Sequence, residues 1–476
     1  MKEKIVNESI EKRAAAFADL SDRIWDYAET AFVEFKSADA LCEALEKEGF
    51  KVERNVADIK TAFTGTYGSG KPVIGILGEF DALFNLSQKS GLPSCEPEIP
   101  GAPGHGCGHN IFGVASLAAA IAVKEYIQKT GCSGTVIYYG TPGEEGGSGK
   151  TFMAREGVFD CLDAAVTWHP SSSNVVRTST SLANIQARFT FKGVASHAGA
   201  TPHKGRSALD ALELMNVGVN FMREHVRSDA RIHYSITNAG GKSPNVVQPI
   251  AEAIYLCRSP RIKEAQTMYE WICDIAKGAA LMTQTKVSVE FMKASSNLVT
   301  NLTLARIMHK NMTAFPLPEQ TKEDIETAQK FYDTYEVNLA ELEAAAEEKG
   351  PEFAKAFKEG TQVPLVNYVT PLYEKIEQGF GSTDVGDVSW VCPTVQLSGA
   401  TCSYGTPGHS WQMVAQGKLP FAHKGLLYAG KVMAGTAIDL LNDPAALEEA
   451  KAEHKKRIGD GYVCPIPKGI VPQALK

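Results

Sequence analysis

Two residues whose side chains bind metals, Cys107 and His109, lie two positions apart in a glycine-rich segment at 104–113. In an extended segment residues i and i+2 project from the same face, so the thiolate and the imidazole could reach one ion together. A lone cysteine is more often a small core residue than a ligand. Further ligands must therefore come from elsewhere in the fold before this segment indicates a metal site.

Further candidate ligands follow short apolar runs that are typical of buried strands. These runs lie at 73–78, 135–140 and 164–170, with helices expected at 113–126 and from about residue 148. Alternating strands and helices predict an α/β sheet covered on both faces, in which ligands bind at the carboxyl ends of the strands. The side chains at or just past these ends are Asp81, Glu144, Glu145 and His169. We expect them to meet Cys107 and His109 at one edge of one sheet.

A later loop adds His409 to the candidate ligands. The full set is Cys107, His109, Glu145, His169 and His409. If these residues share one site, they are too many for one closed tetrahedral zinc and suit two ions with a shared ligand. Two divalent metals lower the pKa of bound water and polarise a carbonyl group, which is the chemistry of amide hydrolysis. The sequence therefore predicts a two-metal hydrolase.

The adjacent residues Glu144 and Glu145 need not have the same role. On an irregular loop their side chains diverge, so one could bind a metal while the other moves a proton from water to the leaving amine. Asp81 could accept the free N–H of a ligating imidazole and fix its tautomer.

Each of these assignments has a structural alternative. Cys107 could be a buried small residue, and His169 could be a histidine with satisfied hydrogen bonds at a strand end. The two glutamates could enrich the first turn of a helix, where the dipole favours acids. His409 could cap a helix. The alternatives are weak in combination, because the candidates recur at successive strand ends.

Composition limits the class of protein. The 476 residues are 44% hydrophobic and 22% charged, which is typical of a soluble globular protein with more than one domain. A net charge of −7 argues against nucleic acid or an anionic membrane as the main partner. We expect no apolar run long enough to span a membrane, and residues 1–8 do not resemble a signal peptide. Ten cysteines without paired spacing suit reduced thiols, so a cytoplasmic location is expected.

The pattern changes at about residue 186. The expected order from there to 299 is strand, helix, two strands, helix, strand, which fits a ferredoxin-like α+β domain inserted into the first. The catalytic domain would then comprise 1–185 and 300–476. The Glu-, Lys- and Ala-rich stretch at 318–360 predicts solvated helix and carries no chemistry that we can identify.

Five short motifs together resemble the M20 metallopeptidase/amidohydrolase family, in its cysteine-containing, aminoacylase-like branch. They are Gly106-Cys107-Gly108-His109-Asn110, Gly143-Glu144-Glu145-Gly146-Gly147, Trp168-His169-Pro170, Ser196-His197-Ala198 and Gly408-His409. The resemblance covers nearly the whole chain. Many members carry Asp where this chain has Asn110, so no acidic role can be given to that position.

The resemblance implies a mixed-sheet metallopeptidase catalytic domain with an inserted lid or dimerisation domain at 186–299. It implies two metals, Mn or Zn, held by the five candidate ligands, with Glu144 as the general base and Glu145 as a ligand. His197 would reach across a dimer interface to stabilise the oxyanion in the partner's active site. Asn245 and Arg258 on the lid would hold the substrate's carboxylate.

The implied activity is cleavage of the amide bond of N-acyl amino acids, with p-aminobenzoyl-glutamate as the leading substrate. An aminoacylase or dipeptidase with another substrate, a non-catalytic partner of a related hydrolase, and a zinc-stabilised structural module are the alternatives. The expected partners are the small-molecule substrate and a second chain, in a homodimer or a heterodimer with a related subunit.

Overall fold

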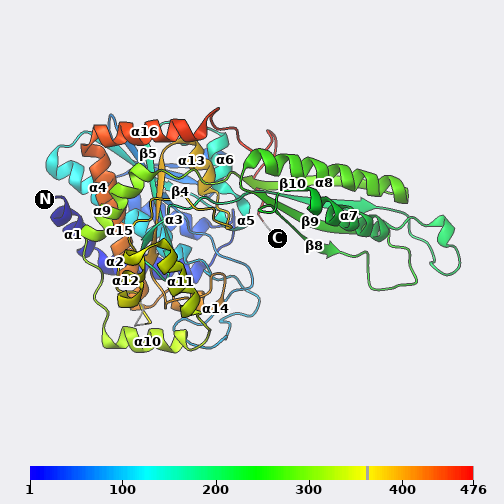
Figure 1. The fold of residues 1–476 in the computed structure, drawn as a ribbon, viewed down its shortest axis with the longest axis horizontal. Helices are drawn as coiled ribbons and strands as arrows, with labels where there is room; N and C mark the ends of the chain where they lie inside the picture. The colour runs from blue at the N-terminus through cyan, green and yellow to red at the C-terminus, as the bar shows by residue number, and fades with distance from the viewer. Residues whose placement is uncertain (361–363, 475–476) are drawn as a thin grey trace.

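The computed structural model describes residues 1–360 and 364–474. The chain forms a larger α/β part and a long, narrow part that extends from one side of it (Figure 1). We call the narrow part the lid, and it comprises the second sheet and two helices described below.

A seven-stranded mixed sheet forms the centre of the larger part. Its strands are β1 (Lys51–Arg54), β2 (Phe63–Ser69), β3 (Val73–Gly78), β4 (Gly134–Gly140), β5 (Ala164–Ser171), β6 (Val175–Val176) and β11 (Thr394–Ala400). They lie in the order β1-β2-β4-β3-β5-β11-β6. The central strands β4, β3, β5 and β11 are parallel, while β1, β2 and β6 pair antiparallel with their neighbours. The three predicted strands are therefore three of the four parallel ones.

Helices cover both faces of this sheet. On the described residues of the larger part they are α1 (Lys2–Glu11), α2 (Ala14–Tyr27), α3 (Phe35–Lys47), α4 (His109–Thr130), α5 (Glu144–Gly147), α6 (Gly149–Arg155), α9 (Leu302–Ala314), α13 (Val385–Val391), α14 (Trp411–Gln416), α15 (Pro420–Asn442) and α16 (Pro444–Ile458). Side chains of a strand alternate between its two faces. Accordingly, Tyr138 and Trp168 enter a core with α4 and α15, whereas Tyr139 enters a second core that continues into the lid.

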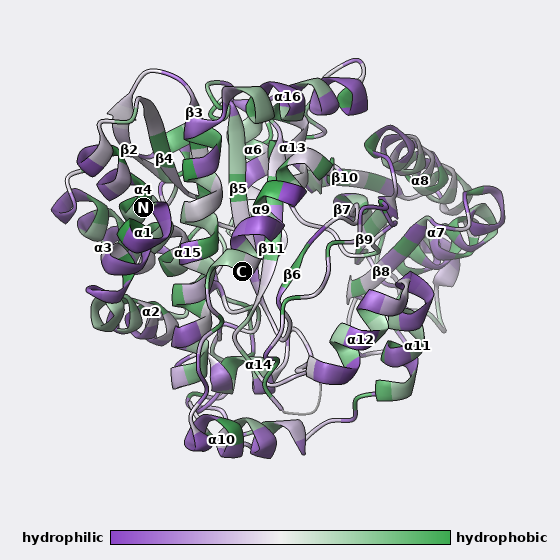
Figure 2. Cartoon of the chain, turned by 60° about the vertical axis from the view of Figure 1, so that its left-hand side comes forward, coloured by the Kyte–Doolittle hydropathy of each residue, from purple (hydrophilic) through white to green (hydrophobic). Residues whose placement is uncertain are grey.

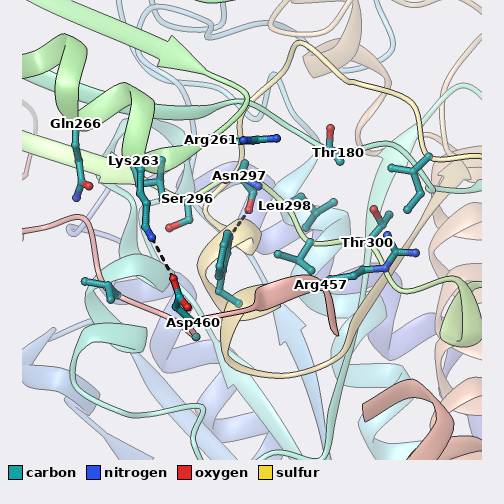
Figure 3. A pocket seen from close by; sticks show the side chains of 16 residues that line it. Thr180, Arg261, Lys263, Gln266, Ser296, Asn297, Leu298, Thr300, Arg457 and Asp460 are labelled. Atoms are coloured by element: carbon teal, nitrogen blue, oxygen red, sulfur yellow. Dashed lines mark hydrogen bonds and ion pairs between the residues drawn. The ribbon is translucent and has the colours of Figure 1, made fainter. Parts of the chain in front are cut away.

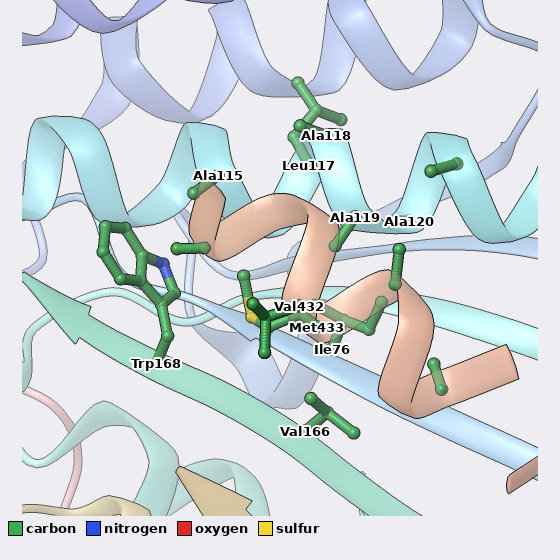
Figure 4. Close-up of a cluster of buried hydrophobic side chains, with 14 of the residues drawn as sticks. Ile76, Ala115, Leu117, Ala118, Ala119, Ala120, Val166, Trp168, Val432 and Met433 are labelled. Atoms are coloured by element: carbon green, nitrogen blue, oxygen red, sulfur yellow. The ribbon is translucent and has the colours of Figure 1, made fainter. Parts of the chain in front are cut away.

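The helix α4 is the innermost helix of the first core. Its alanines, among them Ala115, Ala118 and Ala119, allow α15 to pack closely against it above Ile76 and Val166 (Figure 4). By length and composition α4 could cross a membrane, so the expectation that no apolar run is long enough was wrong. However, 94% of its most apolar window is buried inside the protein. Its apolar character is therefore explained by its place in the core.

The lid has a four-stranded antiparallel sheet with two helices on one face. Its elements are β7 (Ala183–Lys192), α7 (Ala208–Met222), β8 (Arg231–Asn238), β9 (Ile250–Ser259), α8 (Ile262–Thr283) and β10 (Lys286–Ser295). The strands lie in the order β10-β7-β9-β8. In β9, Ala251, Ala253, Tyr255 and Cys257 are buried, and the alternate residues lie on the other face. This arrangement confirms the predicted fold class, a mixed α/β sheet with an α+β insertion.

The stretch predicted as solvated helix contains three helices. They are α10 (Lys322–Tyr332), α11 (Leu339–Lys349) and α12 (Pro351–Gly360). Hydrophilic residues dominate α10 in Figure 2, and α11 has no buried residue. In contrast, α12 buries Phe353 and Phe357, so part of this stretch packs on the protein.

The buried carboxylate of Asp387 on α13 joins three distant segments. It accepts hydrogen bonds from Thr151 Oγ1 on α6 (2.6 Å), from the backbone N–H and the hydroxyl of Ser296 after β10 (3.0 and 2.7 Å), and from Tyr462 OH near the C-terminus (3.0 Å). One side chain thus fixes one of the two connections between the lid and the larger part.

Replacing this carboxylate should destabilise the junction. We expect Asp387→Ala to lower the free energy of unfolding by about 3 kcal/mol or more, because it leaves several buried donors without an acceptor. Urea denaturation followed by circular dichroism measures the change. The control is Asp19→Ala on α2, an exposed carboxylate, which should change stability by less than about 0.5 kcal/mol. Equal effects of the two substitutions would contradict this role for Asp387.

Candidate metal centre

The four parallel strands deliver the predicted residues to one edge of the sheet. Asp81 follows β3, Glu144 and Glu145 follow β4, and His169 lies near the end of β5. His409 lies in the loop after β11. The loop that carries Cys107 ends at His109, the first residue of α4.

Two groups of candidate ligands share the Cys107 thiol. Donor atoms of Cys107, His109 and His169 lie within 4.8 Å of one another, and so do those of Cys107, Glu145 and His409. Cys107 Sγ is 3.4 Å from His169 Nε2, and His409 Nε2 is 3.2 Å from Glu145 Oε1. All five predicted ligands are therefore brought together, in an arrangement with room for two ions that share one ligand.

Glycine is required where the ligand loop folds tightly. Gly108 has φ of +73°, a backbone conformation that favours glycine. A Cβ at this position would lie 2.9 Å from both Met413 Cε and Pro170 Cβ. The glycine therefore allows the backbone between Cys107 and His109 to approach the chain that carries His169.

The surroundings of the donor atoms fit bound metals. His109 Nε2 and Glu145 Oε1 are buried and have no hydrogen-bond partner among the described residues. His169 Nδ1 lies 2.7 Å from the Pro170 carbonyl, to which it donates in the tautomer that leaves Nε2 free to bind a metal. Unsatisfied buried donors and acceptors are costly, and a metal ion would satisfy these atoms.

The charges of the cluster also depend on each other. Burial raises the pKa of the Cys107 thiol. Hydrogen bonds with Cys107 and Glu145 raise the pKa of His409 to about 10, whereas burial and the charge of Arg177 lower the pKa of His169 to about 3. Because metals bind the thiolate and neutral imidazoles, metal binding here would release protons.

Asp81 contacts both the imidazole and the backbone of this cluster. Its Oδ1 lies 3.0 Å from His109 Nδ1, and its Oδ2 accepts a 2.8 Å hydrogen bond from the Glu145 backbone N–H. Burial would raise the pKa of Asp81, but the hydrogen bond with His109 and other interactions hold it below the usual value. The ionised carboxylate thus sets the orientation of two candidate ligands.

Glu144 lies beside the same cluster without belonging to either group. One of its oxygens is within 4.8 Å of donor atoms of Glu79 and His109. Burial, followed by the charges of Glu79 and Glu145, raises the pKa of Glu144 well above its usual value. A carboxylate with a raised pKa is a stronger base, as proton transfer near neutral pH requires.

The lid residues implied by the resemblance lie at its two ends. His197 and Asn245 are exposed neighbours, since the Ala198 N–H donates to the Asn245 carbonyl at 2.9 Å. Arg258 lies near the other end of β9, on the side of the larger part, where Nη1 is 3.5 Å from Ser382 Oγ. From Ile250 to Arg258 the strand rises by about 27 Å. Within one chain, Asn245 and Arg258 therefore cannot hold the same carboxylate.

A buried charge cluster that sequence reasoning missed supports the site from below. Lys150 Nζ lies 2.7 Å from Glu79 Oε1 and 2.8 Å from Asp384 Oδ1, and all three side chains are at most 2% exposed. The other Glu79 oxygen is 3.2 Å from His109 Nε2. A signal was present, because Glu79 is two residues before Asp81 and Lys150 closes the Glu144–Gly149 loop.

Two further basic residues near the site were also missed. Lys293 on β10 is close enough to Glu144 and Glu145 for their charges to raise its pKa, although burial keeps it below the usual value. Arg177 follows β6 and lies near Cys107. Asn110, by contrast, donates to Ser21 Oγ and the Gly417 carbonyl, both at 3.1 Å, and so binds the scaffold.

A cavity of about 580 Å³ lies elsewhere, at the junction between the lid and the larger part (Figure 3). It is lined by Thr180 and Leu298 of the two connections to the lid and by Lys263, which pairs with Asp460 at 3.5 Å. None of the predicted site residues lines this cavity. The candidate metal centre is therefore separate from it.

Comparison with known proteins decides the family. Residues 75–412 match the model of the peptidase family M20/M25/M40. The chain belongs to this family. One of the subunits of the p-aminobenzoyl-glutamate hydrolase of Escherichia coli (strain K12) is 47% identical over 479 residues, which are 99% of each chain. The resemblance predicted from the motifs is therefore confirmed, and so is the class of enzyme, a hydrolase of amide or peptide bonds.

More distant relatives share the fold of this M20 chain. A second subunit of the same Escherichia coli hydrolase is 25% identical over 323 residues, which are 57% of this chain and 72% of that one. A crystal structure described as a dinuclear metal-binding peptidase of family M20 from Bacillus subtilis superposes with a TM-score of 0.55 at 17% identity, covering 91% of this chain and 99% of that one.

Removal of the shared thiol should affect both groups of ligands. We expect Cys107→Ala to lose about one metal or more per chain, because the thiol belongs to both donor sets. Metal analysis by mass spectrometry after reconstitution and desalting measures the content, and circular dichroism checks the fold. The exposed Cys95 provides the control, Cys95→Ala, which should keep the wild-type content. Full metal content in the Cys107 variant would contradict the assignment.

Proposed function

We propose that this chain hydrolyses the amide bond of N-acyl glutamates, with p-aminobenzoyl-glutamate as the leading substrate. The observation that carries the proposal is the pair of donor groups that share Cys107, with the carboxylate of Glu144 beside them. The substrate comes from the 47% identical relative, whose name states this activity.

We assign two divalent metals, Mn or Zn, to Cys107, His109, Glu145, His169 and His409. Thiolate and imidazole ligands favour zinc, while the family resemblance favours manganese. When bound, such a pair polarises the substrate carbonyl and activates water.

Glu144 is assigned as the general base. Its carboxylate takes the proton from water and delivers it to the leaving amine, so that glutamate departs as a neutral amine. Asp81 holds His109 and the Glu145 backbone in place during the reaction. The raised pKa of Glu144 supports this role.

The lid is assigned to substrate binding and to contact with a second chain. Arg258 suits a substrate carboxylate, since a guanidinium binds a carboxylate through two parallel hydrogen bonds. His197 and Asn245 would act in the site of the partner chain, which is consistent with their distance from Arg258 in their own chain.

Exposed apolar residues on the lid support an assembly of chains. Leu214, Val217 and Phe221 on α7 are 37%, 50% and 74% exposed, and their spacing places them on one helix face. The 47% identical relative is named as one subunit of its hydrolase, which supports a heterodimer with a related chain; a homodimer is the alternative. We place the protein in the cytoplasm because its ten cysteines are free thiols, and cell fractionation tests this location.

Replacing the general base tests the catalytic assignment. We expect Glu144→Gln to lower kcat for p-aminobenzoyl-glutamate by roughly 10²- to 10⁴-fold with metal content unchanged, because the amide cannot accept the proton. A panel of other N-acyl amino acids and dipeptides, assayed with the wild-type chain, separates this function from an aminoacylase or dipeptidase.

The matched control is Glu98→Gln, an exposed glutamate far from the donor groups in the chain, which should keep full activity. Unchanged turnover in the Glu144 variant would instead favour a non-catalytic partner of a related hydrolase. Absence of glutamate release from every substrate by the wild-type chain would refute the substrate assignment.

Mixing two inactive variants tests whether His197 acts in the partner's site. We expect His197→Ala and Glu144→Gln to be inactive separately. Refolded together in equal amounts as a homodimer, they should recover about a quarter of wild-type activity, because half of the dimers are mixed and each has one intact site. Recovery of no activity from a verified mixed dimer would show that His197 does not act across the interface.

A further inference from the structure

Arg177 lies beside the candidate metal centre and has no assigned role. It follows β6, the strand next to β11, and its backbone N–H donates to the Gln396 carbonyl at 2.9 Å. Its side-chain Nε–H donates to Ser398 Oγ at 2.7 Å. In the register of the sheet Ser398 pairs with His169 on β5 and with Val175 on β6. The guanidinium is therefore held next to the strand position of a candidate ligand.

Electrostatic effects agree with this placement. The charge of Arg177 is, after burial, the largest influence that lowers the pKa of His169. The pKa of Arg177 itself is lowered by the surrounding protein, and the Cys107 thiol is the group whose charge opposes this. Solvent nevertheless reaches Arg177, which is exposed. Arg177 thus lies in an open part of the site and not in the closed core.

The guanidinium lacks the partner that arginines usually have. Among the described residues, no carboxylate forms an ion pair with Arg177, and its two Nη groups have no hydrogen-bond partner. Arg188 and Arg306, by comparison, each pair with a glutamate at 2.8–2.9 Å. Arg258 resembles Arg177, because it too has no carboxylate partner within the described part of the chain and its buried Nε has no acceptor there.

An unpaired cation is costly at this position. It lies beside residues that would hold two divalent metals, so its charge adds to a strongly positive region when the metals are bound. A bound anion would offset this cost, and a carboxylate matches the planar fork of the remaining N–H donors.

We propose that Arg177 binds a carboxylate of the substrate. This proposal rests on the proposed function, since an N-acyl glutamate has two free carboxylates. Arg258 on the lid accounts for one of them, and Arg177 on the larger part accounts for the other. The two arginines thereby select N-acyl amino acids with a second carboxylate over those with one.

The experiment compares three substrates that differ only in their carboxylates: p-aminobenzoyl-glutamate, p-aminobenzoyl-glutamine and p-aminobenzoyl-4-aminobutyrate. The second lacks the side-chain carboxylate, and the third lacks the α-carboxylate. We expect Arg177→Gln to lower kcat/KM for the glutamate substrate by about 10- to 100-fold, mainly through KM. It should also affect the single-carboxylate substrate that keeps the group bound by Arg177, and leave the other one unchanged.

Two further variants complete the comparison. Arg177→Lys should recover part of the activity, because it keeps the charge and loses the two-pronged hydrogen bond. Arg227→Gln removes an exposed arginine that pairs with Asp229 on the lid, and it should behave as the wild type. Metal content is measured in every variant, because Arg177 lies next to His169.

Three results would overturn the proposal. An equal fall in kcat for all three substrates would indicate a role in oxyanion stabilisation or metal placement, and a loss of metal would indicate a structural role. No change for any substrate would show that Arg177 does not contact substrate.

Failure of the proposed function can be distinguished from failure of this inference. If the wild-type chain cleaves none of the three substrates, calorimetric titration of the metal-loaded protein with glutarate still tests the anion site. A weaker affinity in Arg177→Gln supports the assignment, whereas equal or unmeasurable binding in both proteins refutes it.

Discussion

The candidate metal centre depends on the parallel pairing of β4, β3, β5 and β11. Parallel strands end at the same edge of the sheet, so residues that follow them meet although long stretches of chain separate them. Asp81, Glu144 and His169 are brought together in this way. The loop that carries Cys107 lies over the same edge because α4 packs against the sheet from its first residue.

Concentrating ligands at one edge has an electrostatic cost that the surrounding residues offset. Four acidic groups lie close together there, and burial alone would protonate them. Lys150 compensates two of these charges, Glu79 and Asp384, through direct ion pairs below the site. Asp81 is kept ionised by His109. Breaking such a buried pair typically costs several kcal/mol, so the same contacts stabilise the fold and set the charges of the site.

The lid separates its functional residues by the length of its sheet. Arg258 lies where the lid joins the larger part, whereas His197 and Asn245 lie at the far end of the same sheet. A ferredoxin-like arrangement with both helices on one face leaves the other face and an edge strand open. This geometry is consistent with an insertion that serves the site of its own chain at one end and that of a second chain at the other.

The sequence alone determined the ligand types, the strand ends that carry them and the strand–helix order of the lid, because these features depend on local periodicity and short motifs. Tertiary structure decided which side chains meet. Lys150 and Asp384 are 234 positions apart, and Arg177 reaches the site only through the register of β6, β11 and β5. It also decided that the apolar helix α4 is a core helix, since apolar length is equal in a core and in a membrane. Such contacts depend on how distant segments pack, and no local pattern in the sequence records them.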